Sequence, residues 1–125
     1  MSSNAKKSIL VLEDDDVCRE VIRSVLHAAG FKVLCAREFD EAIRIVEHGE
    51  PIDVALVDVK MPPGTPHGVS FARMAQQRRP RLKIIFMSSS INLRDTLTID
   101  DGEPFLYKPF APQHLLSLLE REAAA

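Results

Sequence analysis

Short runs of branched apolar residues alternate with stretches of helical spacing, and this alternation constrains the fold more than any other feature of the chain. Apolar runs without polar alternation are typical of strands buried on both faces. We expect strands at residues 9–12, 31–36, 52–57, 82–87 and 105–107, and helices at about 17–29, 40–48, 69–78 and 113–124. Strands that alternate with helices imply βαβ units, and therefore an α/β fold with a mostly parallel sheet covered on both faces.

The first expected helix has the clearest start and end signals. Four consecutive carboxylates at 13–16 precede it, and an aspartate suits both the N-cap and the positive end of the helix dipole. Gly30 follows its last apolar residue, as is common just beyond a helix end. Its apolar residues recur at helical spacing: Val17, Val21, Ile22, Val25, Leu26 and Ala29.

Length and composition are those of one ordinary globular domain. The 125 residues are 46% apolar and 27% charged, so we expect a single domain with its core at about 8–122. The formal net charge of -2 argues against a dedicated nucleic-acid or membrane-surface binder, because phosphate-tracking proteins carry a basic excess. No apolar run approaches the length of a membrane span, and we expect a cytoplasmic protein with reduced cysteines at 18 and 35.

Polar residues stand where the expected strands end. In open α/β sheets, ligands bind beyond the carboxyl ends of the strands, at the switch point of the strand order. The residues at these ends are Glu13, Asp14, Asp58, Ser88 and Lys108. Positions far apart in the chain would therefore bring carboxylates, a hydroxyl and an ammonium group into one shallow cleft.

This set of groups favours phosphoryl transfer with Mg²⁺. Clustered carboxylates repel one another, and a hard divalent cation with oxygen ligands lowers that energy. A metal, a carboxylate and a lysine together can position a phosphoryl group and neutralise the charge that builds on its oxygens. Asp58, faced by Lys108, would itself be the acceptor and would form an acyl phosphate.

At these positions the chain resembles the receiver domains of two-component response regulators, of the chemotaxis-receiver kind. The resemblance covers nearly the whole chain and rests on several motifs in the right order. They are residues 9–15 (ILVLEDD), 54–58 (VALVD), 61–62 (MP), 84–89 (IIFMSS) and 108–110 (KPF). It implies a flavodoxin-like, doubly wound sheet of five parallel strands in the order 2-1-3-4-5, with five helices.

The resemblance also implies a metal site and a phosphoacceptor. Asp58 matches the phosphoaccepting aspartate, and Glu13 and Asp14 match the acidic pair that organises Mg²⁺. By this match Asp14 and Asp58 would bind the metal directly, the main-chain carbonyl of Lys60 would be a third ligand, and Glu13 would act through water. Such a domain is a signalling switch rather than an enzyme, although it assists its own phosphorylation and dephosphorylation.

Three further residues receive roles from the same resemblance. Ser88 matches the switch hydroxyl that bonds a phosphoryl oxygen, and Lys108 matches the ammonium that pairs with another. Phe105 stands where the family has its switch aromatic. The bond between Lys108 and Pro109 resembles the family's cis peptide. The implied partners are a sensor histidine kinase or a histidine phosphotransfer protein and a downstream protein target, and a homodimer remains open.

Two segments depart from the family pattern. The loop at 62–68 is about two residues longer than usual, and the stretch between Ser88 and Lys108 is about two residues shorter. We therefore expect a fourth helix that is short or irregular. His67 lies in the longer loop, and we interpret it as a solvent-exposed spacer because no acids partner it in the pattern.

Two other functions compete with the phosphoacceptor hypothesis. One is a receiver-like adaptor that binds its partner without phosphorylation. The other is a magnesium-dependent phosphohydrolase with an aspartyl-phosphate intermediate. Such hydrolases usually have a second aspartate two positions after the nucleophile, and here that position is Lys60.

Overall fold

The computed structural model describes residues 7–60, 68–89 and 102–124. Five strands form one parallel sheet in the order β2-β1-β3-β4-β5, which confirms the expected flavodoxin-like α/β fold. The strands are β1 (Ser8–Leu12), β2 (Lys32–Ala36), β3 (Val54–Asp58), β4 (Lys83–Ser88) and β5 (Phe105–Tyr107). The helices are α1 (Asp16–Ala28), α2 (Phe39–Glu47), α3 (Gly68–Arg78) and α5 (Pro112–Ala124).

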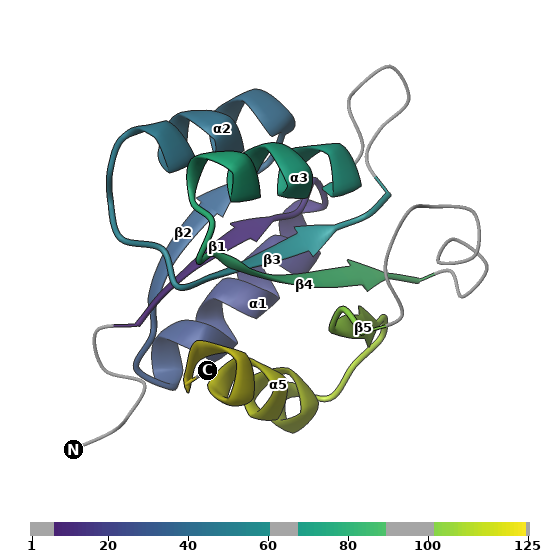
Figure 1. Cartoon of the computed structure of the whole chain (residues 1–125). Helices are drawn as coiled ribbons and strands as arrows, with labels where there is room; N and C mark the ends of the chain where they lie inside the picture. Colours follow the sequence, from purple (N-terminus) through teal and green to yellow (C-terminus); the bar gives the residue numbers. More distant parts are fainter. Residues whose placement is uncertain (1–6, 61–67, 90–101, 125) are drawn as a thin grey trace.

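Helices cover both faces of this sheet, with α2 and α3 on one face and α1 and α5 on the other (Figure 1). Each face has its own apolar core. Leu10, Val57 and Phe86 lie in the core beneath α2 and α3, whereas Leu56 and Met87 lie in the core beneath α1 and α5. Because successive residues of a strand point to opposite faces, a continuous apolar strand supplies both cores.

The ends of α1 follow the expected chemistry. The Asp15 side chain caps the helix by accepting a hydrogen bond from the Cys18 N–H at 2.7 Å. At the other end Gly30 has a φ of 95°, in the left-handed region that glycine adopts without steric cost. The capping signals therefore located this helix to within a residue or two.

The apolar stripe of α1 is only partly buried. Ile22 and Leu26 are buried against the sheet, whereas Val17 is 73% exposed and Val21 is 55% exposed. The buried seam continues through Cys18, Val25 and Ala29, which pack against the same core. Val17 and Val21 lie about 100° around the helix from Cys18 and Ile22, so they fall outside this seam.

Two strands end one residue later than the sequence suggested. We expected the third strand at 52–57 and the fourth at 82–87, but β3 and β4 include Asp58 and Ser88. The ladder itself extends them: Asp58 pairs with Met87, and Ser88 pairs with Tyr107. Asp58 and Ser88 are thus fixed by strand hydrogen bonding rather than placed on loops.

Some expectations lie outside the described residues. These are the fourth helix, residues 91–101 and the loop that contains His67. Within the described ranges no helix is long and apolar enough to cross a membrane. Cys18 and Cys35 are free, in agreement with the expectation that both are reduced.

Candidate functional site

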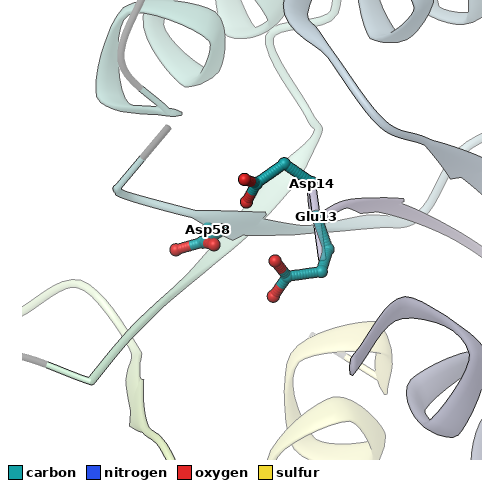
Figure 2. A group of neighbouring side chains, drawn as sticks. All are labelled: Glu13, Asp14 and Asp58. Carbon is teal, nitrogen blue, oxygen red and sulfur yellow. The ribbon is translucent and has the colours of Figure 1, made fainter. Parts of the chain in front are cut away.

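Three strands deliver charged side chains to the same edge of the sheet. Glu13 and Asp14 directly follow β1, Asp58 ends β3, and Lys108 follows β5. Carboxylate oxygens of the three acids lie within 4.8 Å of one another. Figure 2 shows these acidic side chains grouped at the ends of β1 and β3. The convergence expected from the strand order is therefore present.

Lys108 joins the acids of two strands. Its Nζ lies 3.3 Å from Oδ2 of Asp58 and in close contact with Oε1 of Glu13. The structure also places a cis peptide bond between Lys108 and Pro109. The backbone N–H of Lys108 donates to the Ser88 carbonyl at 2.9 Å, which holds the start of this segment against β4. One ammonium group thus contacts carboxylates that lie 95 and 50 residues away in the chain.

Backbone hydrogen bonds fix the two buried acids. The N–H of Asp15 donates to Oε2 of Glu13 at 3.1 Å, and the N–H of Lys60 donates to Oδ1 of Asp58 at 3.1 Å. Glu13 is 1% exposed and Asp58 is 5% exposed, whereas Asp14 is exposed. The site therefore has a buried floor of two oriented carboxylates and an exposed carboxylate at its rim.

The three buried or half-buried charges do not balance. Burial, reinforced by the Glu13 charge, raises the pKa of Asp58 to about 7 despite the opposing attraction of Lys108. Burial also acts to raise the pKa of Glu13, but hydrogen bonds from Lys108 and the Asp15 backbone outweigh it and lower that pKa. Glu13 and Lys108 therefore form the ionised pair, and Asp58 is the acid whose charge lacks full compensation.

The donor set fits a hard divalent cation. All three acidic side chains offer oxygen ligands, and Asp58 is held in a site that disfavours its negative charge. A cation bound there would offset the repulsion among the acids. Mg²⁺ suits such a site, because it is commonly held by one or two carboxylates and keeps several waters.

The remaining predicted residues lie on β4, on β5 and just after β3. Ser88, at the end of β4, is 1% exposed. It directly follows Met87, which pairs with Asp58, and its carbonyl accepts the hydrogen bond from the Lys108 N–H. Phe105 begins β5 and is half-buried, with its ring 4.7 Å from that of Tyr107. Lys60 is exposed and contributes its backbone N–H to Asp58.

Sequence analysis did not identify the part played by Gly68. A Cβ atom at this position would lie 2.1 Å from the backbone oxygen of Asp58 and 2.8 Å from Cγ1 of Val57. The first residue of α3 therefore packs directly on the strand end that carries Asp58. Its place between a proline-rich loop and a helix was the available signal, but the close approach itself depends on the tertiary structure.

Comparisons with known proteins agree with this geometry. The family model for the response regulator receiver domain matches residues 9–120. The transcriptional regulatory protein GltR of Pseudomonas aeruginosa is 32% identical over 125 aligned residues, an alignment that covers 96% of this chain and 50% of that protein. AruR, a transcriptional regulatory protein of the same organism, is 25% identical over 87% of this chain and 46% of its own length.

Solved structures give the same result. A response regulator receiver protein from Sinorhizobium medicae superposes with a TM-score of 0.85 at 25% identity and covers 95% of both chains. The chemotaxis protein CheY4 of Vibrio cholerae superposes with a TM-score of 0.79 at 26% identity, covering 94% of this chain and 98% of its own. By contrast, the chain spans about half the length, or less, of the curated relatives that it matches.

Proposed function

Because this chain belongs to the response regulator receiver domain family, we propose that it is a phosphoaccepting signalling switch in which Asp58 takes the phosphoryl group. The donor would be the phosphohistidine of a sensor kinase or of a phosphotransfer protein. The observation that supports this most strongly is the Lys108 ammonium group, which contacts both Glu13 and Asp58 across three strands. An acceptor carboxylate beside a fixed cation is the arrangement that aspartyl phosphorylation needs.

In the proposed step an Asp58 carboxylate oxygen attacks the phosphorus atom. The new P–O bond forms as the P–N bond to the donor imidazole breaks, and the imidazole leaves with the electron pair and takes up a proton. Asp58 must be ionised to attack, and Lys108 favours that form by lying 3.3 Å from Oδ2. Lys108 can also pair with a phosphoryl oxygen as negative charge develops there.

The acids at the site would hold Mg²⁺. Asp14 and Asp58 would be direct ligands together with the carbonyl of Lys60, and Glu13 would act through water. When bound, the cation supplies neutralisation of charge on the phosphoryl oxygens. The chain's own contribution is to keep Glu13 and Asp58 at fixed positions through the backbone donors of Asp15 and Lys60.

Phosphorylation would act as a switch through charge. It replaces the single negative charge of the Asp58 carboxylate by about one and a half to two negative charges on a phosphoryl group, and it adds new acceptor oxygens at a site where Lys108 now pairs with carboxylates. We propose that Ser88 bonds a phosphoryl oxygen and that the conformation of Phe105 changes with it. The change would bias an existing equilibrium and alter contacts with a downstream protein. This switch would operate in the cytoplasm.

Labelling with acetyl phosphate tests the proposal. In Mg²⁺ the parent protein should gain the mass of one phosphoryl group, detected by intact-mass spectrometry, and Asp58→Asn should gain none. A gain that persists in Asp58→Asn would show that the acceptor is another residue. Continuous hydrolysis of phosphomonoesters would instead favour a phosphohydrolase, although Lys60 stands where such enzymes have a second aspartate.

A second measurement separates the switch from an adaptor. Beryllofluoride with Mg²⁺ mimics a bound phosphoryl group, and amide NMR reports the response along the chain. A switch requires changes at Ser88 and Phe105 in the parent and none in Asp58→Asn. Changes confined to the metal ligands would favour an adaptor that does not depend on phosphorylation.

A further inference from the structure

The strand that leads to Lys108 is short and lies last in the sheet order. β5 has only three residues, Phe105–Tyr107, and pairs with β4. Its backbone is tied at one end by the Phe86 N–H, which donates to the Pro104 carbonyl at 3.1 Å, and at the other by the bond from Lys108 to Ser88. A three-residue strand makes few ladder bonds, so side-chain contacts have a large influence on where it lies.

An ion pair connects the residues before this strand to α3. Nη1 of Arg73 lies 3.0 Å from Oε2 of Glu103, and Nη2 lies 2.5 Å from Oε1, which is a bidentate arrangement. The Glu103 side chain is 17% exposed and that of Arg73 is 37% exposed. Bidentate pairs between arginine and a carboxylate fix orientation as well as distance, and partial burial reduces screening by water.

The same guanidinium group also contacts β4. The Arg73 guanidinium carbon lies 5.7 Å from the centre of the Phe86 ring, within the range of a cation–π contact. Phe86 is fully buried and pairs in register with Phe105. Arg73 thus contacts the Phe86 ring on β4 and the Glu103 carboxylate just before β5, and it connects α3 with both strands.

From these contacts we infer that Arg73 and Glu103 are positioning residues for the reaction at Asp58. Their ion pair holds the start of β5, and so fixes where Phe105 and Lys108 lie relative to the phosphoacceptor. The expected effect of this ion pair on phosphorylation rests on the proposed function. Its expected effect on the position of β5 is independent of that function. The sequence motifs of the site include neither residue.

A second ion pair on the same helix provides a matched control. Arg78 is the last residue of α3, five positions after Arg73, and its Nε is 3.0 Å from Oε2 of Glu47 on α2. The two side chains are 39% and 46% exposed. This pair joins two helices, and within the described residues neither side chain has a hydrogen bond or ion pair to β5, so its loss should leave Lys108 in place.

The experiment compares two double-mutant cycles. One contains Arg73→Ala, Glu103→Ala and the double variant, and the other makes the same changes at Arg78 and Glu47. The rate of Asp58 phosphorylation by acetyl phosphate in Mg²⁺ is measured by intact mass at a temperature where circular dichroism shows each variant folded. Amide NMR without any phosphoryl donor reports the positions of Leu106 and Lys108.

We expect each change at Arg73 or Glu103 to slow phosphorylation about tenfold, within the loss that a displacement of about an ångström produces. The double variant should be no slower than either single variant, because each single substitution already removes the same ion pair. Arg73→Lys should recover part of the rate, since lysine keeps the positive charge but cannot form the bidentate contact with Glu103. Amides of Leu106 and Lys108 should shift in this cycle, while rates and amides stay unchanged in the control cycle.

Parent-like rates and unshifted amides in folded Arg73→Ala and Glu103→Ala would overturn the inference. Equal slowing in the control cycle would overturn it too, because it would show a general effect of stability. If Arg73→Ala does not fold, Arg73→Lys and Glu103→Gln decide the question by the same criteria. Failure of the parent to become labelled would refute the proposed function, whereas the amide shifts would still decide whether the pair positions β5.

Discussion

The unbalanced charge of Asp58 predicts how the stability of the metal-free protein depends on pH. The pKa of this carboxyl rises from 3.8 to about 7 on folding, chiefly because the group is buried and secondly because Glu13 is close. The folded state therefore holds the Asp58 proton more tightly than the unfolded state. As pH rises above 3.8 the unfolded chain ionises first, so the free energy of unfolding falls until the folded carboxyl also ionises near pH 7.

The size of this effect follows from the shift. A change of about three pKa units corresponds to about 4 kcal/mol, at about 1.4 kcal/mol for each unit. Asp58 is 5% exposed, so screening by water reduces this value little. Replacing Asp58 by asparagine removes the ionisable group and with it the penalty. We expect Asp58→Asn to be more stable than the parent by up to about 4 kcal/mol near pH 8 and by about 2 kcal/mol near pH 5.

Urea unfolding in EDTA, followed by circular dichroism, measures this difference across the pH range. Glu120→Gln, which removes an exposed charge on α5, is the control and should follow the parent closely at each pH. The reasoning is refuted if Asp58→Asn is no more stable than the parent near pH 8. It is refuted as well if the difference in the free energy of unfolding between Asp58→Asn and the parent stays constant from pH 5 to pH 8.

Two further predictions concern the same strand end. Gly68→Ala should destabilise the protein by about 1–3 kcal/mol in urea unfolding, because the added Cβ would lie 2.1 Å from the Asp58 backbone oxygen. Gly102→Ala has no neighbour within 4 Å and should change stability far less, and equal effects would contradict the packing argument. Mg²⁺ at tenfold above its dissociation constant should stabilise the parent by about 1.4 kcal/mol in thermal unfolding. Asp14→Asn should weaken this response, and a full response in that variant would exclude Asp14 from the metal site.

Much of the fold was predictable because the sheet is parallel. Its strands are buried on both faces and appear in the sequence as continuous apolar runs, and the rule that ligands bind beyond the strand ends selects Glu13, Asp14, Asp58 and Lys108. The structure brings these four residues together. Local chemistry also located the α1 cap, because an N-cap depends only on neighbouring residues.

The rest depends on contacts that no local pattern records. The periodicity of α1 gives the direction of its apolar stripe but not its buried width, so Val17 and Val21 were not expected to be exposed. The closeness of Gly68 to the Asp58 carbonyl depends on how the start of α3 packs on the end of β3. Arg73 and Glu103 are 30 residues apart, and only the packing of α3 against β4 and β5 reveals their ion pair.

Chemical mapping of the phosphorylated residue tests the central claim most directly. The protein is treated with acetyl phosphate and Mg²⁺, the acyl phosphate is reduced with borohydride, and peptides are sequenced by mass spectrometry. Our account predicts that reduction converts residue 58 to homoserine and leaves Glu13 and Asp14 unchanged. Reduction at another acid, or a phosphoryl group found on a histidine or serine, would contradict it.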